Sequence, residues 1–86
     1  MPEISRFFGI IITMKANDHN PPHLHAKYQD EQAIFDIQSG EILRGKFSER
    51  AARLVQDWIQ LHSVELMVDW NLASKNQLIF PITPLK

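Results

Sequence analysis

The spacing of apolar residues changes once along this chain, at Ser48, and that change constrains the fold class. Before Ser48, short apolar segments rich in β-branched and aromatic residues alternate with brief polar breaks, which is typical of strands joined by tight turns. After Ser48, apolar residues recur at helical spacing, at Ala51, Leu54, Val55, Trp58 and Ile59. A strand half followed by a helical half predicts an α+β fold.

The first half is expected to form an antiparallel sheet. Strands are predicted at residues 4–14, as one long strand or a strand bent at Gly9, and at His23–Tyr28, 33–37 and 42–47. The connections between successive segments are short, which favours hairpins over crossovers. The sequence therefore predicts an antiparallel β-meander of about four strands.

The second half is expected to be helical, followed by an apolar tail. Ser48 is a good N-cap, and Glu49 sits in the first turn, where the helix dipole favours a negative charge. The pattern runs on to Ala73 with a shift of phase near Ser63, which predicts one bent helix or two consecutive helices packed on one face of the sheet, with Ser63 capping the second. Residues 78–82 are expected to add an edge strand or to dock on the sheet. The chain is read as a single domain over residues 1–86, with a strand half (1–47), a helical half (48–75) and a C-terminal tail (76–86).

Composition excludes several classes of protein. The 86 residues contain no cysteine, which excludes a disulfide scaffold and a cysteine-based zinc site. The N-terminal segment lacks the features of a signal peptide, and no apolar run approaches the length of a membrane span, so a cytoplasmic location without a membrane contact is expected. The net charge of −1 shows no basic excess, so any contact with nucleic acid must be local.

One segment is chemically unusual: Asp18-His-Asn-Pro-Pro-His-Leu-His25. It holds three of the four histidines, His19, His23 and His25. Because side chains two apart on a strand share a face, His23, His25 and Lys27 should project together. If the hairpins pair in simple register, neighbouring strands add Asp36, Arg44 and Lys46 to the same patch.

Three interpretations of this patch remain open. The first is acid–base chemistry on RNA or another phosphate ester, in which one imidazole takes a proton while another gives one and Lys27, Arg44 or Lys46 holds the phosphate; this is the chemistry of a metal-independent ribonuclease. The second is a metal site, with His19, His23 and His25 as ligands and Asp18 or Asp36 as a fourth. The third is structural, with the segment only capping a turn and starting a strand.

A tightly bound metal ion is not expected from the sequence, and no cofactor is expected. Three histidines without a cysteine make a site that also needs acceptors to orient the imidazole rings. Only Asp18 and Asp36 are obvious candidates for that role.

The chain resembles the small bacterial family DUF 4160, a domain of unknown function. The resemblance rests on Pro2-x-Ile-Ser-x-Phe-x-Gly-Ile, then Asp-His-Asn-Pro-Pro-His-Leu-His-Ala, then Gly40-Glu-Ile-Leu-x-Gly45, and then Leu54, Trp58, His62, Glu65 and Trp70 in the helical half. It departs at Ser48, where relatives often have proline, and in its unusually apolar tail from Gln77. The resemblance implies no established catalytic residues. The residues that match the family's motif and could take part in chemistry are His19, His23 and His25.

The resemblance also implies a genetic setting. Members are often encoded beside a small protein of the DUF 2442 type, and such pairs look like toxin–antitoxin modules with this type as the toxin. We therefore expect a toxin-like component acting on RNA or translation through the histidine patch. The alternative is a noncatalytic module that works by pairing with the neighbouring protein. Apolar groups on the first strand and in the tail also predict a homodimer or a heteromeric complex.

Overall fold

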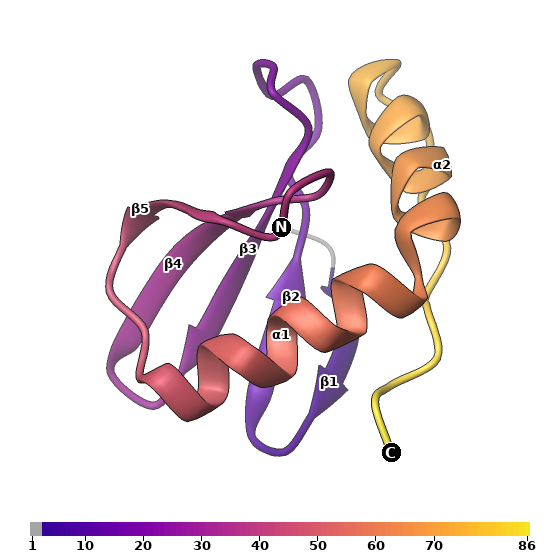
Figure 1. Cartoon of the computed structure of the whole chain (residues 1–86). Coiled ribbons are helices and arrows are strands. Elements are labelled where there is room, and N and C mark those ends of the chain that lie inside the picture. Colours follow the sequence, from indigo (N-terminus) through magenta and orange to yellow (C-terminus); the bar gives the residue numbers. More distant parts are fainter. Residues whose placement is uncertain (1–2) are drawn as a thin grey trace.

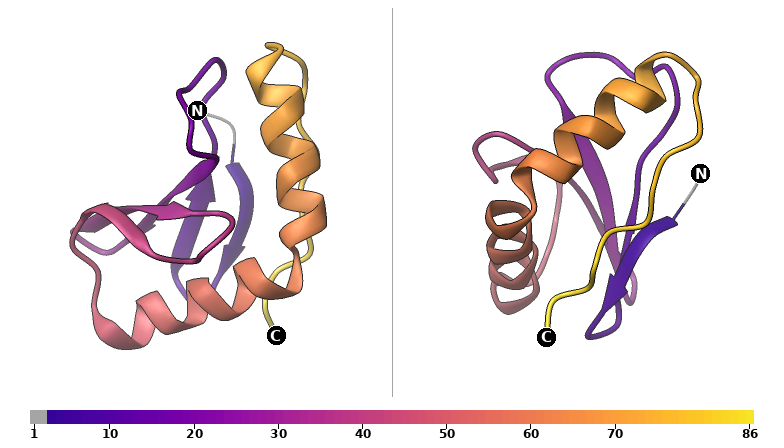
Figure 2. Two further views of the ribbon diagram at one scale, coloured as in Figure 1. Left: turned by 45° about the horizontal axis from the view of Figure 1, so that its top comes forward. Right: turned by 90° about the vertical axis from the view of Figure 1, so that its right-hand side faces the viewer.

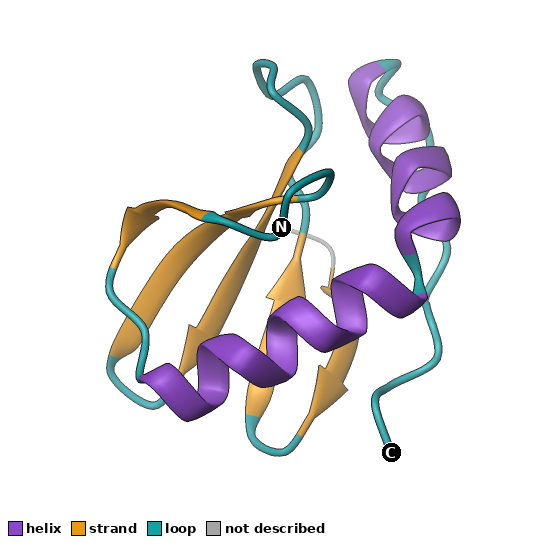
Figure 3. Cartoon of the chain, viewed as in Figure 1, coloured by secondary structure: helices purple, strands orange, loops and turns teal. Residues whose placement is uncertain are grey.

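The computed structural model describes residues 3–86, which form one antiparallel sheet and two helices (Figures 1 and 3). The elements are β1 (Glu3–Phe7), β2 (Ile10–Thr13), β3 (His23–Tyr28), β4 (Glu31–Asp36), β5 (Ile42–Gly45), α1 (Glu49–Leu61) and α2 (Ser63–Ser74). The sheet has the order β1-β2-β3-β4-β5, and every neighbouring pair is antiparallel. The predicted α+β class and meander topology are confirmed.

The sheet has five strands rather than about four, because residues 4–14 fold as a hairpin. Phe8 and Gly9 both have positive φ, 51° and 79°, and they form the two-residue turn between β1 and β2. Hairpin turns of this kind need positive φ at both central positions so that the twist of the turn matches that of the strands. Gly9 satisfies that need readily, whereas a phenylalanine gives no sequence signal for it.

Two consecutive helices follow the sheet, as expected. The Ser48 hydroxyl accepts a hydrogen bond from the Ala51 N–H at 3.3 Å and caps α1. The predicted cap at Ser63 is wrong: Ser63 is the first residue of α2, and His62 precedes it as the N-cap without a side-chain bond. The chain turns at His62 because its φ and ψ of −118° and 26° leave the helical region, so α2 runs off at an angle to α1 (Figure 1).

The core lies between one face of the sheet and the helices. Leu24 and Phe35 from the central strands and Val55 and Trp58 from α1 are fully buried there. Both helices lie on the same side of the sheet, α1 across it and α2 beyond its end, and the opposite face of the sheet carries no helix (Figure 2). Over residues 3–86, neither helix has the length and apolar character that crossing a membrane requires.

The C-terminal tail docks on the molecule and adds no strand. The Ile82 N–H donates to the Ile4 carbonyl of β1 at 2.8 Å, and the Trp58 indole N–H donates to the Thr83 carbonyl at 2.9 Å. Figure 2 shows the tail running back along α2 and β1. The edge strand that was one of two expectations for residues 78–82 is therefore absent, and Leu78 and Phe80 remain exposed.

Asp69 of α2 binds the C-terminal tail, and its carboxyl group should make the stability of the fold depend on pH. Its Oδ1 accepts the Phe80 N–H at 2.8 Å, and the residue is 1% exposed. Burial raises the pKa of this carboxyl, the Phe80 N–H opposes the shift, and Glu65 one turn earlier adds to it. A raised pKa means that the folded chain keeps this proton after the unfolded chain has lost it, so stability from this group falls as pH rises above the usual aspartate value of about 4.

Asp69→Asn keeps an oxygen for the Phe80 N–H and removes the titration. We expect its melting temperature, relative to the wild type, to increase between about pH 4 and about pH 7. If the difference in melting temperature between the variant and the wild type stays constant or shrinks as pH rises, the pKa of Asp69 is not raised in the folded chain.

Gly45 lies where β5 approaches the backbone of β4 so closely that no side chain fits. Its φ is +92°, and a Cβ there would collide with the Gln32 carbonyl oxygen and lie 2.9 Å from the Ala33 Cα. Gly40 has a similar φ of +78° but only the flexible Gln56 side chain nearby, at 3.6 Å. Gly40→Ala should therefore cost only the left-handed backbone penalty of roughly 1–2 kcal/mol. Gly45→Ala should cost clearly more in urea unfolding, and equal losses would show that β4 and β5 are not in this register.

Candidate functional site

The loop between β2 and β3, residues 14–22, folds back beside the start of β3 and is held from two sides. The Asn17 N–H donates to the Ala73 carbonyl near the end of α2 at 3.0 Å, and the Pro22 carbonyl accepts the Ile37 N–H at 3.0 Å. Figure 1 shows the loop facing the far end of α2. The loop that carries Asp18 is therefore fixed against both the sheet and the second helix.

His23 is enclosed at the base of this loop. It is 8% exposed, and its ring centroid lies 5.1 Å from that of Trp70 on α2. Its Nδ1 is 2.8 Å from the Pro21 carbonyl oxygen, and its Nε2 is 2.8 Å from Asp18 Oδ2. Both ring nitrogens thus face oxygen acceptors. Because a neutral imidazole has one N–H, it can donate to only one of these two oxygens at a time.

Asp18 is positioned by its own loop. The His19 backbone N–H donates to Asp18 Oδ1 at 2.9 Å, which leaves Oδ2 directed at the histidines. Burial raises the pKa of the Asp18 carboxyl, but the His19 N–H and the contact with His23 outweigh it, and the pKa is lowered from its usual value. Asp18 is therefore a carboxylate at neutral pH.

His25 lies next to this pair. Its Nε2 is buried, has no hydrogen-bond partner and is 3.6 Å from Asp18 Oδ2. Its ring centroid is 5.5 Å from that of His23. Burial lowers the pKa of His25, the Asp18 carboxylate opposes that shift, and the positive charges of Lys15 and His23 add to it. His25 is therefore neutral at pH 7.

Together these residues form the Asp18–His23–His25 cluster, in which one ligand atom from each residue lies within 4.8 Å of the others. His19, predicted as the third histidine of the patch, does not join it: it is exposed in the loop, and its backbone serves Asp18. Two of the three candidate histidines are brought together with Asp18, which the sequence predicted as a possible further ligand.

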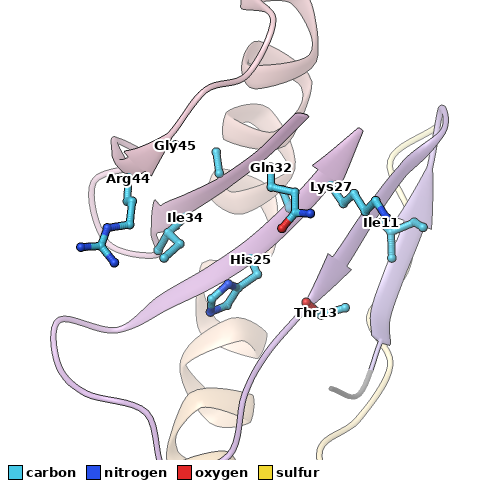
Figure 4. A pocket seen from close by; sticks show the side chains of 10 residues that line it. Ile11, Thr13, His25, Lys27, Gln32, Ile34, Arg44 and Gly45 are labelled. Atoms are coloured by element: carbon cyan, nitrogen blue, oxygen red, sulfur yellow. The ribbon is translucent and has the colours of Figure 1, made fainter. Parts of the chain in front are cut away.

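A cavity of about 440 Å³ opens on the face of the sheet that carries no helix. Of the predicted patch, His25 and Lys27 from β3 and Arg44 from β5 line it (Figure 4). Figure 4 shows His25 and Lys27 between Arg44 on one side and Ile11 on the other. His25 belongs both to this cavity and to the cluster.

Two predicted supporting residues lie elsewhere. Asp36 pairs with His23 in the register of β3 and β4, but its Oδ1 accepts the Gln38 and Ser39 N–H groups at 2.7 and 2.9 Å and closes a turn. Lys46 follows the end of β5 and is not among the residues that line the cavity. Simple alternation fails there because the β4–β5 register shifts between Ile34 and Phe35 and Gly45 has positive φ.

Sequence reasoning missed four contributors to the site. Thr13 and Gln32 line the cavity, Trp70 lies against His23, and the Pro21 carbonyl fixes the His23 ring. Thr13 follows Ile11 in strand alternation, and that signal was available. The Pro21 carbonyl has no signature in sequence, because any residue supplies one.

His62, the fourth histidine, is not part of the site. Its Nδ1 lies 2.7 Å from Glu65 Oε1, three residues further along the chain. This is the local contact that the spacing of the two residues predicts.

Comparison with known proteins gives one match. No curated protein and no solved structure matches the chain. A family model described as a domain of unknown function, DUF4160, matches residues 9–71, well over half of the chain. The matched range contains every residue of the Asp18–His23–His25 cluster and of the cavity, as well as Trp70. The chain belongs to the DUF4160 family.

Proposed function

We propose that this chain is the toxin-like member of a bacterial two-protein module and that it acts in the cytoplasm on RNA through the cavity on the open face of the sheet. The observation that carries the proposal is the gathering of His25, Lys27 and Arg44 around one cavity on the face that the helices leave free. The family itself is of unknown function, and the pairing with a DUF 2442 partner rests on the resemblance described above.

The cavity suits a nucleotide backbone. Lys27 and Arg44 come from strands on either side of β4, so two cations flank the same hollow. A guanidinium binds phosphate in a bidentate manner, and an ammonium adds a point charge. Thr13 and Gln32 supply hydrogen-bonding groups, and Ile11 and Ile34 supply apolar surface for a ribose or base. These cations act locally, which is consistent with a chain of net charge −1.

The chemistry available there is that of a single imidazole. His25 is neutral at pH 7 because burial lowers its pKa, and a neutral imidazole accepts a proton as a general base. Lys27 and Arg44 stabilise negative charge that develops on the phosphate. Both nitrogens of His23 are engaged by Pro21 and Asp18, so His23 does not supply the second imidazole that a two-histidine relay requires.

The Lys27→Ala/Arg44→Ala double variant tests RNA binding. We expect weaker binding of single-stranded RNA and a slope of log affinity against log salt that is smaller in magnitude by roughly 1.4, because two phosphate contacts are lost. Binding is measured by fluorescence anisotropy over a salt series. Growth arrest on expression should disappear in the double variant and in His25→Ala.

Arg53→Ala is the matched control, because Arg53 is an exposed cation on α1, which covers the other face of the sheet. It should leave affinity, salt slope and growth arrest unchanged. Equal effects of the control and the double variant, or growth arrest that survives both the double variant and His25→Ala, would exclude the cavity as the site of action.

The alternative function is a noncatalytic module that works by pairing with the neighbouring small protein. One observation favours it: several large apolar side chains of the helical half are exposed. Val64 and Val68, one turn apart on α2, are 76% and 48% exposed, and Leu61 at the end of α1 is 69% exposed. Leu78 and Phe80 of the tail are exposed as well. Exposed apolar surface on so small a domain usually marks a contact with another protein.

A Val64→Glu/Val68→Glu variant tests this pairing. With the wild-type chain, the purified neighbouring protein should co-elute and raise the melting temperature, because a ligand specific for the folded state stabilises it. The double variant should lose both effects, and Asn71→Glu, at an exposed polar position of the same helix, should keep them. Light scattering of the chain alone across a dilution series separates a homodimer from a heteromer.

A strict monomer that does not bind its neighbour at any concentration would refute the pairing in both forms. Pairing that persists in the Lys27→Ala/Arg44→Ala variant, together with an absence of growth arrest in the wild type, would favour the noncatalytic module over the toxin.

A further inference from the structure

We propose that Asp18, His23 and His25 form a binding site for one divalent transition-metal ion of the Zn²⁺ type. This inference goes beyond the proposed function and does not rest on it, because it depends only on the geometry of the Asp18–His23–His25 cluster. The ligand atoms are Asp18 Oδ2 and the Nε2 atoms of both histidines.

His23 is already arranged as a metal ligand. In one tautomer of His23, Nδ1 carries the hydrogen and donates to the Pro21 carbonyl across 2.8 Å. The lone pair of a neutral ring is then on Nε2, which faces the Asp18 carboxylate at 2.8 Å. A lone pair and a carboxylate repel at that distance unless a cation lies between them. A backbone carbonyl on the far nitrogen is the usual way in which a metal-bound histidine is oriented.

His25 directs a second nitrogen at the same point. Its Nε2 is buried and has no hydrogen-bond partner, and 3.6 Å to Asp18 Oδ2 is too long for a hydrogen bond. A buried polar atom without a partner is destabilising and calls for an explanation. A shared ion satisfies His25 and His23 together, whereas a single proton satisfies only one of them.

The distances fit an ion of this size. With bonds of about 2.0–2.2 Å, neighbouring ligands of a tetrahedral Zn²⁺ lie about 3.4 Å apart. The Asp18–His25 distance of 3.6 Å is close to that value, and the Asp18–His23 distance of 2.8 Å requires the two groups to part slightly. Two imidazoles and one carboxylate suit Zn²⁺, Co²⁺ or Ni²⁺ and leave a coordination position for water or substrate.

The structure contains acceptors that the sequence did not reveal and that orient the proposed metal ligands. The sequence argued against a metal because only Asp18 and Asp36 were obvious candidates for that role. The acceptor for His23 is the Pro21 carbonyl, and the His19 N–H fixes the Asp18 carboxylate through Oδ1. Asp36 is engaged elsewhere and is not needed. The side chains of the cluster are 10–21% exposed, so an ion can reach them from solvent.

The ion would change the role of His25. A metal-bound His25 is a ligand and not a general base, so the metal-bound state and the metal-independent chemistry proposed above exclude each other at this residue. If both proposals hold, Zn²⁺ should inhibit RNA cleavage by the wild-type chain, because His25 cannot act as a base while it binds the ion.

The test is calorimetric titration of ZnCl₂ into protein purified without an affinity tag and stripped with EDTA, with CoCl₂ absorption spectra as a second readout. We expect one ion per chain, a visible Co²⁺ band from a site of low coordination number, and a melting temperature that rises with Zn²⁺. His25→Ala and Asp18→Asn should each weaken binding by about tenfold or more.

The controls are chosen from the other histidines. His19→Ala removes the histidine that the sequence placed in the site, and His62→Ala removes a histidine–carboxylate pair on the helices; neither should change binding. The His23→Ala variant also loses the packing of His23 on Trp70 and could fail to fold for that reason. The test therefore depends on His25→Ala and Asp18→Asn. The Lys27→Ala/Arg44→Ala variant should bind Zn²⁺ normally, which separates this site from the RNA site.

The proposal is overturned if Zn²⁺ neither binds in a one-to-one ratio nor raises the melting temperature. In that case hydrogen bonds alone hold His23 between Pro21 and Asp18. It is also overturned if binding survives both His25→Ala and Asp18→Asn, or if His19→Ala weakens it equally.

Discussion

The packing of His23 against Trp70 is the contact on which the arrangement of the site depends. It joins the first residue of β3 to α2, and the Asn17–Ala73 hydrogen bond joins the preceding loop to the same helix. Since α2 lies beyond the end of the sheet, it supports a loop that the sheet alone would leave unsupported (Figure 1). Asp18 is held beside the histidines as a consequence, and the helical half of the chain has a direct part in building the site.

This dependence explains how much the sequence alone could predict. The change of apolar spacing at Ser48 depends only on local periodicity, and it identified the α+β class, the meander and the two helices correctly. The Phe8–Gly9 turn was missed because phenylalanine rarely adopts the positive φ that this two-residue turn requires. Lys46 was expected beside the histidines because simple register was assumed, and the irregular β4–β5 edge breaks that register. Asp36 does lie opposite His23, but its carboxylate closes the turn after β4.

The site was only partly predictable for the same reason. His23, His25, Lys27 and Arg44 lie where strand alternation and pairing put them. Asp18 was among the predicted ligands, whereas the exclusion of His19 could not be foreseen, because the path of the loop depends partly on its contact with α2. The acceptor that fixes His23 is a backbone carbonyl, which every residue possesses. Sequence patterns identify side chains that can take part in chemistry, whereas long-range contacts decide which of them meet.

Pro21 orients His23 so that its Nε2 faces Asp18, and the geometry of the cluster depends on this orientation. A long-range ¹H–¹⁵N NMR spectrum of the histidine side chains at neutral pH tests this most directly, because it reports which imidazole nitrogen carries hydrogen. In metal-free protein, we expect hydrogen on Nδ1 of His23, where it donates to the Pro21 carbonyl, and a neutral His25. A His23 ring with hydrogen only on Nε2 would contradict this orientation, because the Pro21 carbonyl would then have no donor.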